Sequence, residues 1–444
     1  MCTEFAHHLA GALPRYVCCN DPGRVEVVTY STVAITLGLA VARPRITPRF
    51  RVSPAMAAFA GVLVLALTGS VRLHDVTWAA STMWRPLLGI VAIMLMTGVA
   101  RSLGVLDTVA TFVFEGAEAS PRRLFTRVFV FGALTAAVLN NDSAIMLVTP
   151  LVLDAAKKRT PKLVVPLAFA VFLSAGVAPF IVSNPMNMVV ATYSGIGFNE
   201  YARHMIMPAA ACALVTWAMT SLAFRREMDA ASRSLSYAQI ASVTSESERV
   251  RFSSTQRLVL GALALVVLSY PVVSWLGGPV WAVAAVGAVV MLGIAMRAKV
   301  SPLTLARTEV HYDTLFFLVA ALLLSVGLRN VGIVEHLARM YDGASNGKIG
   351  AISAVGSALL NNHPMSHLNM FALNAHGTGG GLHAGVLAAL IGGDLGPRLF
   401  PIGSLAGLLW IEMLRRAGVE TSVKRFLIIG AITIPAIAIS IALL

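Results

Sequence analysis

The sequence predicts an all-α polytopic membrane protein with about ten transmembrane helices. Of its 444 residues, 57% are apolar and 12% are charged, whereas roughly 25% of the residues in an ordinary soluble domain are charged. The mean hydropathy is +0.77. Several apolar runs also approach the roughly 20 residues that a helix needs to cross a bilayer. These observations exclude a soluble enzyme.

Apolar runs bounded by charged residues mark the expected spans. Ten are predicted, at 27–42, 54–71, 86–103, 163–193, 204–224, 258–276, 280–297, 312–328, 385–414 and 426–444. Residues 1–26 lack the compact apolar stretch and the small-residue cleavage site of a signal peptide. We interpret them as an N-terminal extension, so that the first span serves as the insertion signal.

Two further apolar runs, 128–153 and 349–373, are interrupted near their middle by polar residues. The interruptions are Asn140-Asn141-Asp142-Ser143 and Asn361-Asn362-His363-Pro364. A helix broken within a membrane must have its freed backbone groups satisfied by protein or water. Because the first run has basic residues on both flanks, both of its ends belong on the cytoplasmic side. We therefore predict two re-entrant helical hairpins, the second with both ends outside.

The basic residues indicate how the chain is oriented in the membrane. The chain has 34 Lys and Arg against 21 Asp and Glu, a net charge of +13. Most of the basic residues fall in short loops that this topology places in the cytoplasm, so the charge predicts no nucleic-acid partner. The Ser- and Arg-rich residues 225–257 form the expected cytoplasmic linker, and we expect a disordered basic loop there. The linker separates a first transmembrane repeat, 27–224, from a second, 258–444.

The two halves resemble each other weakly. The stretch Val99–Val105 is similar to Gly327–Ile333, and the Asn-Asn pair of each hairpin recurs in the same order. Since the flanking charges have opposite orientation, we predict two inverted-topology repeats. Each contains three spans, a hairpin, a broken span and a final span.

Two long spans should also be broken. Ser183-Asn184-Pro185-Met186-Asn187 interrupts the span at 163–193, and glycines around Asp394 and Gly403-Ser404 interrupt the span at 385–414. Two hairpin tips that face two broken helices would enclose one polar pocket near the membrane midplane. The predicted substrate-binding residues are Asn140, Asn141, Ser143, Ser183, Asn184, Asn187, Asn361, Asn362, Gly403 and Ser404.

Three ionisable residues are candidates for proton coupling. Asp142 lies beside two asparagines within an apolar run, and an acid at membrane depth indicates a proton carrier. Its alternative is to cap the returning helix. Asp394 is a second candidate, with capping or loop solvation as alternatives. His363 is the third; His367 follows four residues later, but no third ligand lies nearby, so no metal is predicted. Arg329 and Glu335 are expected to mark a solvated span end.

The sequence shows no motif for nucleotide hydrolysis or redox chemistry: no Walker A sequence, no GxGxxG after a strand and no HExxH. We expect no enzyme activity and no cofactor, so transport must use an ion gradient or a separate subunit. None of the four cysteines lies in a hairpin tip or a helix break. The pocket should therefore use oxygen and nitrogen contacts.

Several stretches resemble the ArsB-type arsenite and antimonite efflux permeases of the ion transporter superfamily. The matching residues are Asn141-Asp142 with Thr149-Pro150, Ile181-Val182-Ser183-Asn184, Gly195-Ile196-Gly197-Phe198, Gly327-Leu328-Arg329-Asn330, Asn361-Asn362 and Asp394-Leu395-Gly396-Pro397 with Pro401-Ile402-Gly403-Ser404-Leu405. The resemblance implies export of trivalent arsenic or antimony hydroxide across a bacterial or archaeal inner membrane in exchange for protons. In some members a soluble ATPase subunit is attached.

The chain departs from this family at His363, His367 and Pro185, where apolar residues are expected. A sodium-coupled carboxylate transporter or a Na⁺/H⁺ antiporter of the same superfamily is the alternative. A membrane anchor for a partner ATPase, without transport of its own, is another. The sequence leaves the oligomeric state open.

Overall fold

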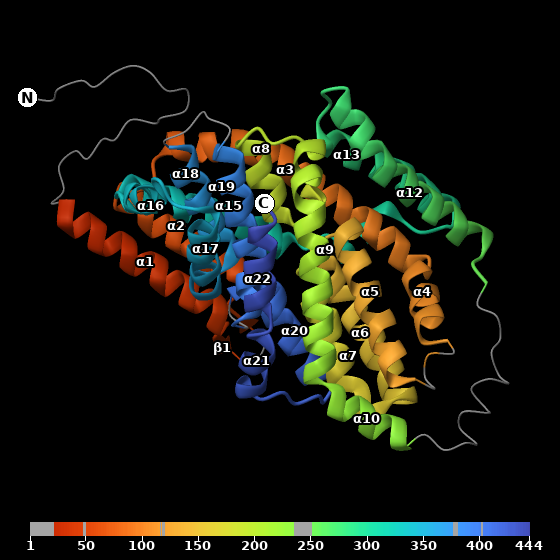
Figure 1. The fold of residues 1–444 in the computed structure, drawn as a ribbon. Coiled ribbons are helices and arrows are strands. Elements are labelled where there is room, and N and C mark those ends of the chain that lie inside the picture. Colours follow the sequence, from red (N-terminus) through yellow and green to blue (C-terminus); the bar gives the residue numbers. More distant parts are fainter. Residues whose placement is uncertain are drawn as a thin grey trace, which may run out of the picture.

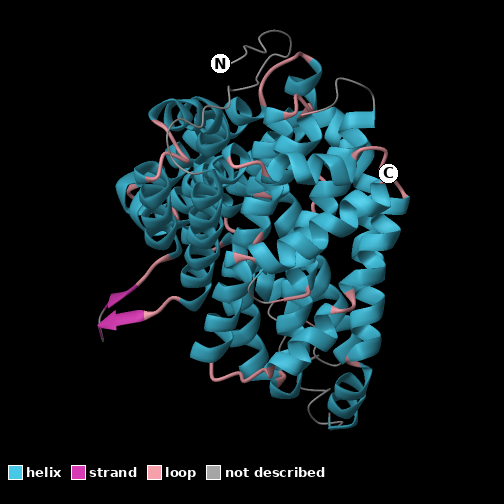
Figure 2. Ribbon diagram, turned by 90° about the vertical axis from the view of Figure 1, so that its left-hand side faces the viewer, coloured by secondary structure: helices cyan, strands magenta, loops and turns pink. Residues whose placement is uncertain are grey.

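The computed structural model describes residues 22–47, 50–115, 117, 120–234, 251–375, 381–400 and 403–444. This part of the chain is helical almost throughout, as predicted (Figure 1). Its only strands are β1 (Arg45–Thr47) and β2 (Phe50–Arg51), an antiparallel pair that projects from the helical body (Figure 2).

Seven helical segments of the described chain are long and apolar enough to cross a membrane. They are α1 (Pro22–Ala42), α3 (Leu73–Ser102), α9 (Phe198–Ala223), α12 (Ser254–Trp275), α13 (Val280–Arg297), α15 (Tyr312–Asn330) and the pair α21 (Val423–Gly430) and α22 (Thr433–Ala442). The three other predicted spans are the 14-residue α2 (Pro54–Leu67) and the two broken segments. The prediction of a multi-pass fold is confirmed.

Two of the differences from the predicted spans have a clear structural cause. Helix α3 begins at Leu73 rather than at 86, because its polar first turn is capped: the Arg72 N–H donates to Asp75 Oδ2 at 2.8 Å, and Asp75 is fully buried. The last span is divided after Gly430, where the Arg398 carbonyl approaches so closely that a Cβ on Gly430 would lie 2.3 Å from it.

Four short helices were not predicted. They are α4 (Val105–Phe114), α10 (Arg225–Ser234), α14 (Pro302–Glu309) and α16 (Ile333–Tyr341). Helices α4 and α16 each follow a glycine in the left-handed region, Gly104 at φ 70° and Gly332 at φ 98°, a conformation that favours glycine. Helix α10 occupies the start of the predicted linker, so the expected loop is wrong over those ten residues.

The interruptions lie where the sequence placed them. Helices α5 (Pro121–Leu139) and α6 (Asn141–Arg159) form the first hairpin, and α17 (Asn346–Leu360) and α18 (Asn362–Asn374) form the second. The first broken span consists of η1 (Pro161–Leu163), α7 (Val164–Ser174), η2 (Ile181–Ser183) and α8 (Pro185–Tyr193). The second consists of α19 (Gly381–Leu395), η3 (Gly396–Arg398) and α20 (Leu405–Arg416). Hairpin and broken span thus occur twice in the same order; their inverted relation stays a prediction.

An aromatic cluster fixes the second broken span against the first. The Trp410 ring stacks on Phe172 at 4.7 Å and meets Phe169 edge-on at 5.1 Å, and Phe426 of α21 closes the cluster. Trp410 is completely buried. Because α7 and α20 come from opposite halves of the chain, this contact positions their polar ends relative to each other.

Candidate functional site

The first asparagine of each hairpin tip is a helix cap. Asn140 and Asn361 have φ values of 88° and 84°, which asparagine tolerates better than most residues. The side-chain oxygen of Asn140 accepts from the Ser143 N–H at 2.8 Å, and that of Asn361 accepts from the His363 N–H at 3.3 Å. The alternative in which Asp142 caps the returning helix is therefore wrong.

The second asparagine of each tip has an unused acceptor. Asn141 and Asn362 are 6% and 5% exposed. The side-chain carbonyl oxygen of each is buried and has no hydrogen-bond partner within the chain. Buried acceptors normally have a partner, so these two oxygens are suited to receive hydrogen bonds from a bound molecule or from water.

At the first helix break, Ser183 and Asn184 form hydrogen bonds with other groups of the chain. Ser183 Oγ donates to the Ala137 carbonyl at 3.1 Å, at the end of α5, and accepts from the Phe180 N–H at 3.2 Å. The Asn184 side chain caps α8 by accepting from the Met186 N–H at 3.1 Å. These contacts anchor the break to the first hairpin, so Ser183 and Asn184 position neighbouring groups in this structure.

Asp394 joins the two halves. The Asn184 amide donates to one of its oxygens, and Asn187 Nδ2 lies 2.9 Å from the other. Asn187 Nδ2 is also 2.9 Å from the Tyr201 hydroxyl, which donates to the Ala178 carbonyl at 3.4 Å. Asp394 is 5% exposed. It is therefore neither a cap nor a solvated loop residue; its partners belong to the first broken span.

Arg398 is the buried cation of this site. It is 3% exposed, its Nη1 donates to the Phe172 carbonyl at 2.7 Å, and its guanidinium lies 4.6 Å from the Phe172 ring centroid. Both Asp142 and Asp394 interact with it electrostatically. Our sequence reasoning missed Arg398, although a cation four residues after Asp394 in an apolar block is a signal that could have found it.

At the second helix break, Ser404 caps a helix and Gly403 allows close packing of the backbone. Ser404 Oγ accepts from the Gly407 N–H at 3.0 Å and so caps α20. A Cβ on Gly403 would lie 2.7 Å from Pro397 Cα and 3.1 Å from the Ser357 carbonyl, which only glycine permits. Both residues are buried, and their contacts hold the break against α17.

His363 lies outside the cluster of Asp142, Asp394 and Arg398. Its ring meets Phe317 of α15 edge-on, with 6.0 Å between the centroids, whereas the charged neighbours of Asp394 are Arg398 and Asp142. His367, one turn further along, is fully buried. Within the described residues, no three His, Cys, Asp or Glu side chains come close enough together to hold a metal ion.

One cysteine lies nearer the site than expected. Cys212 of α9, 4% exposed, lines a small cavity of about 20 Å³ together with Asp394, Gly176 and Ser440. The cavity holds about one water molecule. Cys212 is thus outside the tips and breaks, as the sequence indicated, but adjacent to Asp394.

A much larger cavity, of about 710 Å³, opens between β1–β2 and α20. Met146 of α6 forms part of its wall. Residues four apart lie on the same face of a helix, so Met146 is one turn from Asp142 on that face. We call this cavity the basic vestibule, because arginines line much of it.

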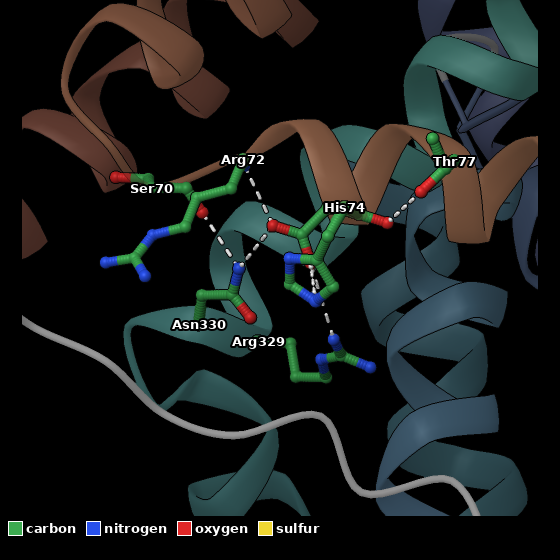
Figure 3. Close-up of polar contacts among 7 residues, drawn as sticks. Ser70, Arg72, His74, Thr77, Arg329 and Asn330 are labelled. Carbon is green, nitrogen blue, oxygen red and sulfur yellow. Dashed lines mark hydrogen bonds and ion pairs between the residues drawn. The ribbon is translucent and has the colours of Figure 1, made fainter.

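At the opposite end of the molecule, a polar cluster joins α3 to α15 (Figure 3). Asn330 Nδ2 donates to the Ser70 carbonyl at 2.9 Å and to Asp75 Oδ2 at 3.3 Å. Arg329 forms a 3.9 Å ion pair with the other oxygen of Asp75. Because the Arg329 side chain is only 17% exposed, the expectation of a solvated span end is wrong for it.

Aromatic rings surround the Arg329 guanidinium. It lies 4.9 Å from the Phe371 centroid and 5.5 Å from the Trp78 centroid. Trp78 in turn contacts Tyr193 at 6.2 Å. Phe371 belongs to the second hairpin and Tyr193 to α8, so this cluster ties both interrupted elements to α3 and α15.

Comparison with known proteins now assigns the family. The family model for the ArsB arsenical pump membrane protein matches residues 33–444. This chain belongs to that family. It is 29% identical to the arsenical pump membrane protein of Escherichia coli K12 over 86% of this chain and 91% of the relative. It is 28% identical to the arsenical pump membrane protein of Yersinia enterocolitica over 93% of this chain and 97% of the relative.

Among solved structures, the Alcanivorax borkumensis YdaH transporter matches with a TM-score of 0.46 and 15% identity, covering 95% of this chain and 98% of that one. Family membership and the apolar helices make the protein a multi-pass plasma membrane protein that serves arsenical efflux. It is a membrane transporter of this family rather than a classical enzyme.

Proposed function

We propose that the protein exports trivalent arsenic or antimony hydroxide from the cytoplasm in exchange for protons. The observation that carries this proposal is the pair of buried, unpartnered oxygens of Asn141 and Asn362, one at each hairpin tip. Arsenous acid is a small neutral hydroxide with three O–H donors, and amide oxygens accept such hydrogen bonds. A third acceptor without a partner, Asn187 Oδ1, lies beside Asp394.

The charge of the buried cluster supports exchange for a proton. With both carboxylates ionised, Asp142, Asp394 and Arg398 carry a net charge of −1, and one proton makes the cluster neutral. An uncompensated charge at membrane depth is costly, so the protonated, neutral cluster favours the return step that carries the proton inward. Asp394 already accepts two amide hydrogen bonds. Asp142 is less buried than Asp394, and we assign it the exchanging proton.

The basic vestibule supports entry from the cytoplasmic side. It reaches Met146, one turn from Asp142, and it borders the basic residues that the charge distribution assigns to the cytoplasm. Its arginines repel sodium ions, whereas a neutral hydroxide enters without electrostatic cost. This argues against the sodium-coupled alternative.

The cavity beside Cys212 is too small for arsenous acid, since it holds about one water. One thiol also provides only one sulfur contact to a metalloid. We infer that transport relies on oxygen and nitrogen contacts. Replacing Cys212 with Ala should leave arsenite transport near the wild-type level, and loss of transport would contradict this inference.

The proposal is tested with the purified chain alone in liposomes. Arsenite and antimonite fluxes are measured with and without a pH gradient, and with and without sodium. We expect flux that depends on the pH gradient and not on sodium, without a partner ATPase. Sodium dependence without metalloid movement would contradict the proposal, and flux only after addition of an ATPase subunit would contradict proton coupling.

A further inference from the structure

The β1–β2 hairpin carries positive charge that the described chain balances only in part. Five of the residues that line the basic vestibule are arginines, Arg43, Arg45, Arg51, Arg415 and Arg416. The lining contains two acids, Asp313 and Glu412. Glu412 is already bound by two of these arginines, with N–O distances of 2.8 and 2.9 Å. The hairpin side of the vestibule is therefore strongly electropositive.

The pairing of the strands makes this charge unfavourable. Arg45 lies directly opposite Arg51 in the antiparallel register, and like charges in that position destabilise a strand pair. A two-stranded ribbon is marginal by itself. Arg43 adds a third positive charge: Asp313 and Glu412 attract it, Arg51 repels it, and its Nε is buried without a hydrogen-bond partner. An anion among these three arginines would reduce the repulsion between them.

The surroundings indicate the source of the anion. The hairpin follows α1 within three residues, and α1 presents Ile35 and Leu39 outward at 62% and 39% exposure. Ile46, directly after Arg45, is 67% exposed. Apolar side chains of a membrane helix that face outward meet lipid. The three arginines thus lie where lipid tails give way to headgroups, at the end of the helix that the charge distribution assigns to the cytoplasm.

We propose that Arg43, Arg45 and Arg51 bind the phosphate of an anionic phospholipid headgroup from the cytoplasmic leaflet. Arginine suits this task because its planar guanidinium donates two parallel hydrogen bonds to a phosphate. The bound lipid holds the hairpin together and attaches the rim of the vestibule to the membrane surface. The site lies at the rim of the vestibule and not at the hairpin tips, and its test uses a readout other than transport.

The test measures thermal unfolding of the full-length protein in neutral detergent. Phosphatidylglycerol, phosphatidylcholine and inorganic phosphate are added separately. We expect phosphatidylglycerol to raise the midpoint by about 2–4 °C, because a ligand that binds only the folded state stabilises it. Phosphatidylcholine and inorganic phosphate at the same concentration should leave it unchanged. An equal rise with inorganic phosphate would overturn the assignment to lipid.

Variants locate the effect. R45Q/R51Q should lose the response to phosphatidylglycerol, whereas R45K/R51K should retain at least half of it. The matched control is R297Q/R307Q, which removes two exposed arginines from another predicted cytoplasmic loop and should respond as the wild type does. If R45Q/R51Q also responds like the wild type, the proposal is overturned.

Discussion

At the scale of single residues, the two asparagines of each hairpin tip have separate tasks. Asn140 and Asn361 cap the returning helices, whereas the oxygens of Asn141 and Asn362 have no partner. The sequence predicted the tips, because a polar pair within an apolar run is easily seen. It could not separate the two tasks, since they depend on which side chain turns back to its own backbone.

This division predicts different results for neighbouring substitutions. Asn141→Ala should raise the KM for arsenite about three- to tenfold, because one hydrogen bond to the substrate contributes roughly 0.5–1.5 kcal/mol. Asn140→Gly keeps the positive φ and should lower the stability by only a few tenths of a kcal/mol. Its KM for arsenite should therefore stay near the wild-type value. Arsenite flux into proteoliposomes measures both. Equal loss of transport in both variants would contradict the assignment.

A second prediction at this scale concerns the buried cation. Asp394→Ala leaves Arg398 without one of its two carboxylates and Asn184 and Asn187 without their acceptor. Each buried polar group that is left without a partner costs about 1–3 kcal/mol, so the variant should unfold at a clearly lower temperature. Asp394→Asn keeps the shape of the side chain, and its unfolding midpoint should lie between those of the wild type and Asp394→Ala. An unchanged midpoint for Asp394→Ala would show that this contact is unimportant for stability.

At the scale of elements, the sequence predicted where helices break but not what they break against. Pro185 and the glycines near Asp394 are visible as interruptions of apolar runs. The partners of Asp394 lie more than 200 residues away in the chain, and no local pattern records such a contact. Tyr201 was missed for the same reason, whereas Arg398 stands four residues after Asp394 and could have been found from the sequence.

Close packing of η3 against α17 gives an element-scale prediction. A Cβ on Gly396 would lie 2.2 Å from the Ala354 carbonyl, so Gly396→Ala must push the broken span away from the second hairpin. We expect a loss of about 1–3 kcal/mol of stability, as for other overpacked sites. Gly385→Ala in α19 is the control, because its Cβ would have ordinary contacts at 3.4 and 3.5 Å. Similar unfolding midpoints for the two variants would contradict this view of the packing.

At the scale of the whole molecule, the two ends differ. The basic vestibule opens at the end with β1–β2, and at the other end the Arg329 cluster ties α8 and α18 to α3 and α15. We propose alternating access by movement of the hairpins and broken helices, which would require these aromatic contacts to separate. The sequence could not predict this cluster, because its residues come from four distant elements.

This cluster predicts coupling between Arg329 and Asp75. Arg329→Ala leaves the Asp75 carboxylate buried and without its cation, so stability should fall by about 3–5 kcal/mol. Asp75→Asn in the same chain should recover part of this loss. A double-mutant cycle on thermal unfolding in detergent measures the coupling energy, expected at about 0.5–3 kcal/mol. Strictly additive effects would show that the ion pair does not join the elements.

Proton exchange through Asp142 is the central claim, and proton movement driven by the substrate tests it most directly. Liposomes that contain the purified chain and a pH-sensitive dye are loaded with arsenite and diluted into arsenite-free buffer. Outward movement of arsenite should acidify the lumen in the wild type and leave its pH unchanged in Asp142→Asn. Arsenite release without acidification in the wild type, or equal acidification in the variant, would contradict the account.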